Sequence, residues 1–219
     1  MLEDDEAEQL LATSNGYQTF ASGRERIIES SGDKEFDYAL AQMLSRLTDT
    51  FRVLPGFAYC DDAGQPNAWA TPKVRMARAD GTVLFGRQYL KKLLAWPEHP
   101  DVAVTAVCAH EFGHILQYKL NLTPMILAGQ KTIKRLELHA DYLAGYYAGI
   151  SKIKEPTYPA AVFAAQQHSA GDLNDNSRQH HGTPHERAAA IVRGFETAYR
   201  ERRNISDAVR IGLNYVSTL

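Results

Sequence analysis

Residues 102–116 read VAVTAVCAHEFGHIL, and this stretch determines how the rest of the chain is interpreted. Its first eight residues are almost entirely apolar, which is typical of a central helix that packs on several sides. His110, Glu111 and His114 interrupt the apolar run. Burying two imidazoles and a carboxylate costs several kcal/mol unless these groups are paired or coordinate a metal. The stretch therefore predicts a buried metal site on a central helix.

The spacing of the polar residues is His-Glu-x-x-His. On a helix of about 3.6 residues per turn, positions four apart share a face, so His110 and His114 can bind one ion. Glu111 lies about 100° round the helix from His110, where it can reach a water on that ion without binding the ion itself. The spacing predicts two zinc ligands and a general base. The alternative is a structural helix that carries these residues by chance.

A catalytic zinc ion needs a third protein ligand, because it takes three and leaves one position for water. An extended His-Glu-x-x-His-x-x-Gly-x-x-His motif would supply that ligand three residues after a glycine. This chain has Gln117 and Leu120 at the two positions concerned, which excludes the extended motif. The third ligand must therefore come from another segment.

Residues 134–145, KRLELHADYLAG, contain the next candidate ligands in a helical context. Glu137 and His139 lie about 200° apart on a helix, so only one of them can face the metal. We favour Glu137, and His139 remains the alternative. Asp141 shares a face with Glu137, and we predict that it orients a ligating imidazole by accepting from its second ring nitrogen.

The combination of His-Glu-x-x-His and Glu-x-x-x-Asp on a second helix resembles the glutamate-type zinc peptidases, or gluzincins. In particular it resembles the family of the prenyl-protein processing protease and the bacterial heat-shock membrane protease, with their small soluble relatives, the minigluzincins. Residues 137–145 are also similar to the second helix of the bacterial neutral zinc metallopeptidases. The resemblance covers residues 35–200. It implies a zincin-like domain with peptidase activity and one Zn²⁺ per chain.

Residues 66–72, PNAWATP, resemble the Asn-Ala-x-Ala-Thr strand of that family, which forms the sheet edge over the cleft. Pro72 is compatible with an edge position, because proline cannot donate to a strand on its far side. The resemblance implies that the substrate chain adds as an extra strand, aligned by backbone hydrogen bonds that read little of its sequence. The implied substrate-binding residues are Asn67, Ala68, Trp69, Ala70 and Thr71.

Residues 181–187, HGTPHER, resemble the family's His-Pro-x-x-x-x-Arg segment, with Gly182 in place of the proline. The resemblance implies that His181 donates to the tetrahedral intermediate. The alternative is a surface histidine beside His180, and Tyr142 and Tyr146 are further candidate donors.

Arg187 lies at the last position of the same segment. A guanidinium suits bidentate pairing with a carboxylate, so we expect Arg187 to bind Asp141 or Glu137 rather than substrate. Thr183, Pro184 and Glu186 form the N-terminal signal of a helix, with Thr183 as the cap of a capping box.

Periodicity and turn signals predict a mostly helical α+β fold with a few short strands. The resemblance implies that these strands form a small mixed or antiparallel sheet packed on the His-Glu-x-x-His helix. We expect an N-terminal extension over residues 1–30 and a zincin-like metallopeptidase domain over 31–219. The predicted helices are 33–51, 87–94, 101–120, 131–150, 158–169, 183–203 and 205–217. The predicted strands are 52–59, 66–72, 74–79 and 82–85.

Chain length, net charge and the lengths of the apolar runs indicate which partners to expect and whether the metal is catalytic. A chain of 219 residues can bury about 70% of its unfolded surface, so it needs no metal to hold its core, which favours a catalytic zinc. A net charge of −2 provides no basic stripe, and we expect no nucleic-acid partner. No apolar run approaches the ~20 residues of a membrane span, and no signal peptide opens the chain. The compartment stays open: cytoplasmic, or periplasmic if an export signal preceded Met1.

The predicted function is a zinc-dependent endopeptidase acting on a protein or peptide substrate. A first alternative is a non-catalytic module that binds a partner peptide at the edge strand, although such a module has no use for Glu111. A second is a latent peptidase whose cleft is blocked by the first 30 residues or by Cys60. Cys60 and Cys108 are too few for a disulfide framework.

Overall fold

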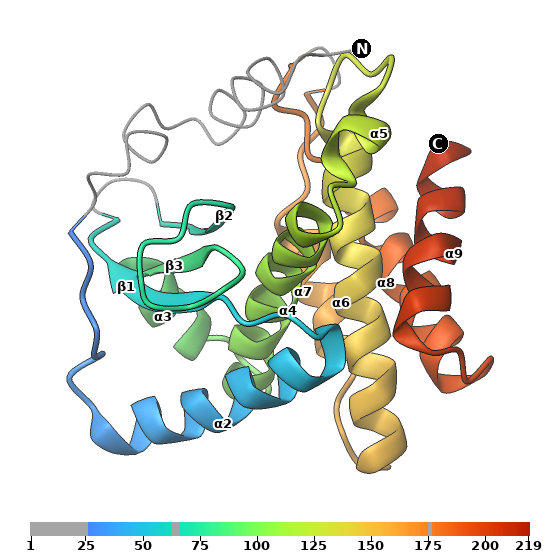
Figure 1. The fold of residues 1–219 in the computed structure, drawn as a ribbon. Helices are drawn as coiled ribbons and strands as arrows, with labels where there is room; N and C mark the ends of the chain where they lie inside the picture. The colour runs from blue at the N-terminus through green and yellow to red at the C-terminus, as the bar shows by residue number, and fades with distance from the viewer. Residues whose placement is uncertain (1–25, 63–65, 175–176) are drawn as a thin grey trace.

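The computed structural model describes residues 26–62, 66–174 and 177–219 (Figure 1). Helices dominate this part of the chain, and a small sheet lies to one side of them, so the predicted α+β class is confirmed. The predicted N-terminal extension falls mostly outside the described residues, and its boundary stays a prediction. Among the helices described, none combines the length and apolar character needed to cross a membrane.

The elements follow the predicted order closely, with one short helix, α5, that the sequence did not indicate. The strands are β1 (Gly56–Cys60), β2 (Ala68–Thr71) and β3 (Thr82–Gly86). The helices are α2 (Lys34–Phe51), α3 (Arg87–Leu94), α4 (Pro100–Lys119), α5 (Thr123–Leu127), α6 (Lys134–Lys154), α7 (Ala161–Ser169), α8 (Pro184–Tyr199) and α9 (Ile205–Ser217).

The sheet is mixed, one of the two arrangements that the sequence predicts, and its strand order is β1-β3-β2. β1 runs parallel to β3 and β2 runs antiparallel to it, which leaves β2 at an edge of the described sheet. The strand predicted for residues 74–79 is wrong. Thr82 explains why, because its Oγ1 accepts from the Arg75 amide at 3.0 Å and donates to the Lys73 carbonyl at 2.9 Å. The segment is folded onto the start of β3 as a loop.

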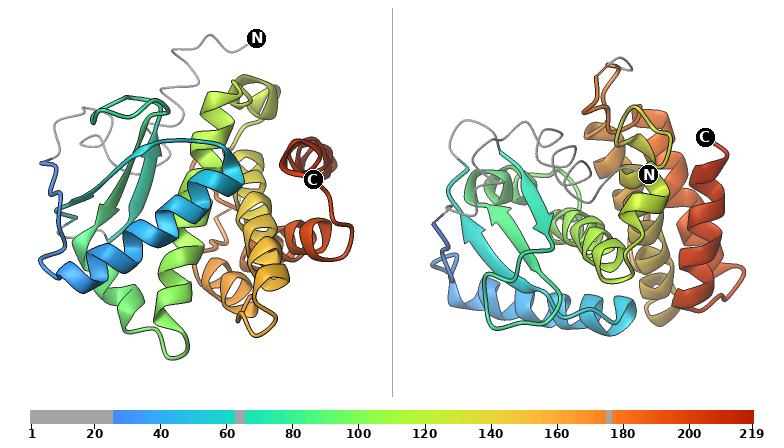
Figure 2. Two further views of the ribbon diagram at one scale, coloured as in Figure 1. Left: turned by 60° about the horizontal axis from the view of Figure 1, so that its bottom comes forward. Right: turned by 45° about the horizontal axis from the view of Figure 1, so that its top comes forward.

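Helix α4 runs between the sheet and the other helices (Figure 2). It packs against β2 on one side and against α6 and α7 on the other. Every residue from Val102 to Gln117 is buried, so the helix has no solvent face over most of its length. This is the all-round burial that the apolar flanks of the His-Glu-x-x-His motif predict.

Helices α6 and α8 cross at very short range. A Cβ added at Gly145 would collide with the backbone of Ile191, and one added at Gly194 would collide with the backbone of Tyr142. Glycine at both positions therefore lets the two helices pack backbone to backbone. The N-terminus of α8 is fixed by the predicted capping box, in which Thr183 and Glu186 bond to each other reciprocally. The capping box thus fixes the start of α8, and the two glycines hold the middle of α8 against the middle of α6.

Candidate metal centre

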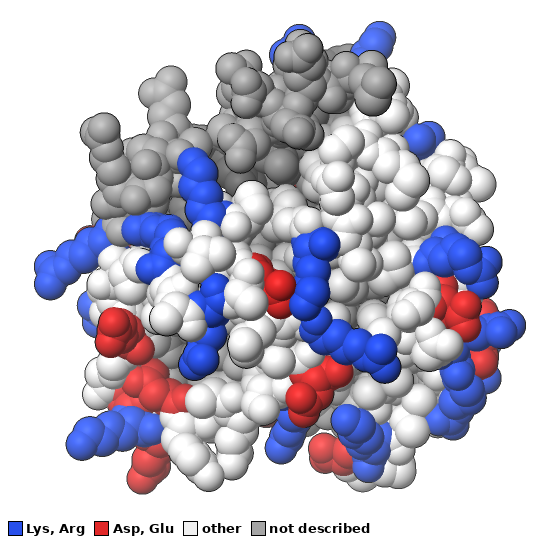
Figure 3. Space-filling view, viewed as in Figure 1, with Lys and Arg blue, Asp and Glu red and all other residues white. Residues whose placement is uncertain are grey.

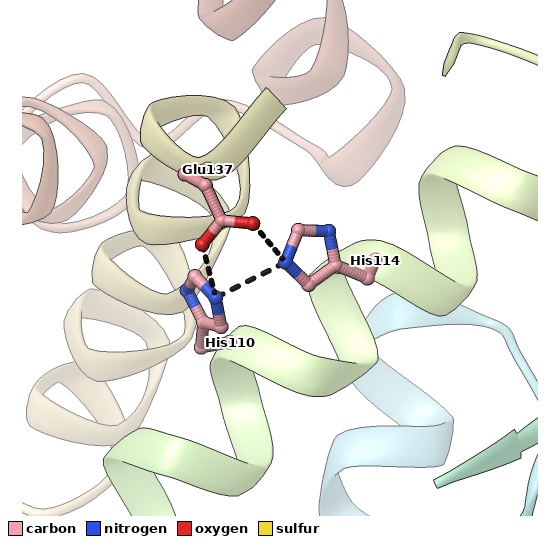
Figure 4. A group of neighbouring side chains, drawn as sticks. All are labelled: His110, His114 and Glu137. Atoms are coloured by element: carbon pink, nitrogen blue, oxygen red, sulfur yellow. Dashed lines mark hydrogen bonds and ion pairs between the residues drawn. The ribbon is translucent and has the colours of Figure 1, made fainter. Parts of the chain in front are cut away.

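Three side chains from two helices converge on one point (Figure 4). His110 and His114 come from α4, and Glu137 comes from the first turn of α6. All three are buried, and each offers one ligand atom within 4.8 Å of the other two. The structure brings Glu137 to the two histidines, and His139 is turned away from them. This group could hold a metal ion.

The spacing of the ligand atoms fits a tetrahedral ion. The two Nε2 atoms of His110 and His114 lie 3.1 Å apart, and each lies 3.4 Å from an oxygen of Glu137. Ligand atoms about 2.0–2.1 Å from a tetrahedral ion lie about 3.3–3.4 Å from one another. The side chains therefore stand at the separations that such an ion requires.

The protonation pattern of the two imidazoles also favours a cation between them. His110 Nδ1 lies 2.8 Å from a carboxylate oxygen of Asp141, and His114 Nδ1 lies 2.8 Å from the amide oxygen of Gln117. Both Nδ1 atoms are thus donors, and in neutral imidazoles both Nε2 atoms carry lone pairs. Two lone pairs facing each other at 3.1 Å repel unless a proton or a metal ion lies between them.

The buried carboxylates around the two imidazoles also favour a cation between them. Burial alone would lower the pKa of His110, but Asp141 and Glu137 outweigh it and raise the pKa to about 10. Burial alone would raise the pKa of Glu137, but His181 and His114 outweigh it and hold the pKa well below its usual range. The carboxylates are therefore ionised and favour positive charge at the two imidazoles.

A buried ion pair supports His110 from behind. Arg187 donates to Asp141 in a bidentate manner, from Nε to Oδ2 at 2.7 Å and from Nη2 to Oδ1 at 2.9 Å. Burial would raise the pKa of Asp141, but Arg187 and His110 outweigh it, so Asp141 stays ionised. Asp141 thus contacts the imidazole of His110 and Arg187 pairs with the Asp141 carboxylate, which are the contacts that the sequence predicts for these two residues.

Glu111 is the acidic residue of the motif that stays out of the ligand group. It is buried and lines the pocket in front of His110, His114 and Glu137. Burial raises the pKa of Glu111 above its usual value, although His110 and His114 act in the opposite direction. A carboxylate with a raised pKa beside a metal site is suited to accept a proton and release it again.

The predicted substrate strand forms one wall of this pocket. Asn67, Ala68, Trp69 and Ala70 line it, while Thr71 lies outside the lining and pairs with Thr82. Thr71, alone among the five residues predicted to bind substrate, therefore belongs to the sheet but does not line the pocket.

Hydrogen-bond alternation shows which backbone groups of β2 point away from β3. The Gly86 amide donates to the Asn67 carbonyl at 2.9 Å, so residues 67 and 86 form a hydrogen-bonded pair. Such pairs alternate along an antiparallel ladder, and the N–H and C=O groups of Ala68 and Ala70 therefore point away from β3. The Ala70 carbonyl weakly accepts from the Tyr118 hydroxyl at 3.5 Å. The edge presents two residues to which an extended chain can bond.

His181 also lines the pocket, from the loop before α8. Its Nδ1 is 3.2 Å from Glu137 Oε2, and its backbone amide donates to Asp172 at 2.9 Å. Burial lowers the pKa of His181, but Glu137 outweighs it and raises the pKa above its usual value. Gly182 has φ +100°, which proline with its fixed negative φ cannot adopt, so the departure from the family pattern reflects a different turn at this point.

The two further candidate donors, Tyr142 and Tyr146, lie outside the pocket lining. The Tyr142 hydroxyl donates to Thr197 Oγ1 at 2.8 Å, and the Tyr146 hydroxyl donates to the Arg203 carbonyl at 2.9 Å. Both rings point towards α8 and the segment after it, and neither lines the pocket. Cys60 and Cys108 carry buried thiols in β1 and α4, outside the pocket lining.

Sequence reasoning missed several residues of the pocket and its support. Tyr118 lies four residues after His114, so helical spacing could have placed it on the ligand face. Gln117 contacts His114 from three residues away, and the same rule could have found it. Tyr89 lines the pocket from α3, where burial raises its pKa to about 12, and no sequence signal points to it.

Neither the charge on the surface nor similarity to known proteins points to a function. On the face shown in Figure 3, acidic and basic side chains lie interspersed rather than gathered by sign. Comparisons with protein-family models, with curated proteins and with solved structures found no match. A functional proposal for this chain therefore depends on the residues of the metal centre and on the motif resemblance.

Proposed function

We propose that this protein is a zinc-dependent endopeptidase with a zincin-like fold. The observation that carries the proposal is the convergence of His110, His114 and Glu137 at tetrahedral spacing, with Glu111 beside them in the same pocket. Two imidazoles and one carboxylate form a donor set that zinc accepts and that leaves a fourth position for water. Zinc is the metal we propose for this set, one ion per chain.

Each residue of the pocket has its own role in the proposed hydrolysis. When bound, zinc would polarise the scissile carbonyl and lower the pKa of a coordinated water to about 7. Glu111 takes a proton from the attacking water and passes it to the nitrogen of the leaving amine. His181 donates a hydrogen bond to the oxygen of the tetrahedral carbon. Asp141 and Arg187 keep His110 oriented while charge develops in front of it.

The substrate is held by the edge of β2. Backbone groups of Ala68 and Ala70 face the pocket, so an extended peptide can pair with them as an added strand. This mode of binding needs no free chain terminus, which favours internal cleavage. It also reads little of the substrate sequence, so we expect broad specificity for unfolded polypeptides.

The test combines metal analysis with an activity assay. Purified protein should contain about one zinc per chain, cleave unfolded casein, lose cleavage with 1,10-phenanthroline and regain it when zinc is restored. Glu111→Gln is the matched control, because it removes the base but none of the three ligands. Absence of zinc binding, or cleavage that persists in the chelator or in Glu111→Gln, would overturn the proposal.

The alternative function, a non-catalytic or latent zincin-fold module that binds a partner peptide, would use the same edge strand. It predicts that Glu111→Gln has no functional effect, because peptide pairing with β2 does not involve that side chain. In a latent form, deletion of residues 1–30 would switch cleavage on. The two variants therefore separate the three possibilities.

A further inference from the structure

Gln117 occupies an enclosed position behind His114. Its side chain is fully buried and makes three hydrogen-bond contacts. Nε2 lies 2.9 Å from the Leu136 carbonyl and 3.0 Å from His139 Nδ1, and Oε1 lies 2.8 Å from His114 Nδ1. Leu136 immediately precedes the ligand Glu137, so Gln117 joins α4 to the first turn of α6.

The Leu136 carbonyl fixes the orientation of the Gln117 amide. A carbonyl can only accept, so the Gln117 atom that faces it must be the NH₂ group. The amide oxygen then faces His114 Nδ1, which must be protonated. His114 is thereby held in the tautomer whose Nε2 lone pair points towards His110 and Glu137.

The same argument fixes His139. Its Nδ1 faces the second hydrogen of the Gln117 amide, so Nδ1 is an acceptor and the ring is neutral with its proton on Nε2. That Nε2 lies 3.4 Å from the Val209 carbonyl, a long contact with a group that can only accept. Helix α9 packs closely here, because a Cβ added at Gly212 would approach the His139 ring to 3.0 Å.

We propose that Gln117 and His139 are positioning residues for the metal centre. A hydrogen-bonded chain runs from Val209 in α9 through His139 and Gln117 to His114, and it holds His114 in its metal-binding tautomer. This inference rests on the proposed metal centre and adds α9, which contributes no ligand, to the elements that organise it. Outer partners of metal-binding histidines commonly set metal affinity in this way.

The experiment measures zinc dissociation constants by competition with a chromophoric chelator, and melting temperatures of the zinc-free proteins. Gln117→Met removes all three bonds at similar volume and should weaken zinc binding about 10- to 100-fold. His139→Leu should also weaken it, whereas His139→Asn should restore it, because the Asn oxygen can take the place of Nδ1. Tyr142→Phe is the control, since it loses a buried hydrogen bond to Thr197 but keeps the ring that stacks on His139.

The outcomes separate this inference from the proposed function. If the parent protein binds no zinc, the metal centre itself is wrong. If the parent binds zinc and Gln117→Met and His139→Leu bind it as tightly as Tyr142→Phe does, the positioning role is wrong. Weaker binding in both variants with rescue by His139→Asn supports it. The His139 pair keeps the test valid even if Gln117→Met fails to fold.

Discussion

The two histidines of the centre are supported by flanks of opposite character. Behind His110 lies a charged flank, in which Asp141 accepts from the imidazole and pairs with Arg187. Behind His114 lies a neutral flank, made of Gln117 and His139. Both flanks fix the same tautomer, so charge is not needed for orientation. The charged flank also favours a positive charge on the His110 imidazole. It depends on Arg187, because Arg187 neutralises the buried Asp141 carboxylate.

The largest expected effect on stability comes from breaking the ion pair of the charged flank. Arg187→Met leaves the fully buried Asp141 carboxylate without its guanidinium, and should lower the free energy of unfolding by about 3–5 kcal/mol. Urea denaturation of the zinc-free protein measures it. The double variant Arg187→Met/Asp141→Asn should recover part of the loss, because it removes the uncompensated charge. A change in the single variant no larger than that of an exposed pair such as Arg200 and Glu196 would contradict this account of the flank.

His181 tests the ligand that lies between the two flanks. Its imidazole contacts Glu137 from the pocket side, so His181→Ala should leave both flanks and zinc binding intact. Turnover should fall about 100- to 1000-fold, the usual cost of losing one donor to the tetrahedral intermediate. Parallel measurements of zinc content and kcat on casein-derived peptide distinguish the roles. If His181→Ala has normal turnover, His181 has only a structural role. If the variant loses zinc, His181 helps to hold the metal rather than the intermediate.

Asp141→Asn makes the charged flank resemble the neutral one. The amide oxygen can still accept from His110 Nδ1, but the negative charge is gone. Zinc affinity should fall about 10- to 100-fold, as is usual for such outer partners. Chelator competition gives the value, with Asp172→Asn as a control carboxylate that contacts His180 but no ligand. Equal affinity in parent and Asp141→Asn would mean that the charge of this flank contributes nothing.

Gln117→Glu makes the reciprocal change on the neutral flank. A carboxylate can accept from His114 Nδ1, but it can no longer donate to Leu136 or His139. The free energy of unfolding should fall by about 1–3 kcal/mol, the usual cost of buried polar groups left without partners. Urea denaturation at neutral pH provides the measurement. Stability equal to that of the parent would show that the two donated bonds are not needed.

The sequence could predict the parts of this molecule that depend on helical spacing. His110 and His114 stand four apart on one helix, and Asp141 stands four after Glu137, so each pair is placed by local geometry alone. The capping box at Thr183 is likewise local and appears as predicted. The mostly helical class also follows from helical periodicity, whereas the sequence leaves the sheet as either mixed or antiparallel.

The parts that the sequence did not predict depend on contacts between distant segments. The contact of Gln117 with His114 is local and helical spacing could indicate it, but the bond of Gln117 to His139 joins α4 to α6 and no local pattern points to it. Tyr142 follows Asp141 directly, and a rotation of about 100° round the helix points it at α8 instead of the pocket. The sequence predicts a short strand at residues 74–79, but Thr82 bonds to the Arg75 amide and the Lys73 carbonyl and holds the segment as a loop.

The central claim is that His110, His114 and Glu137 bind one zinc ion with a position left for water. X-ray absorption at the zinc edge of the loaded protein tests it most directly. We predict nitrogen and oxygen ligands at about 2.0–2.1 Å, including two imidazoles, and one protein ligand fewer in Glu137→Ala. Sulfur ligands at about 2.3 Å, or a spectrum unchanged by Glu137→Ala, would contradict the claim.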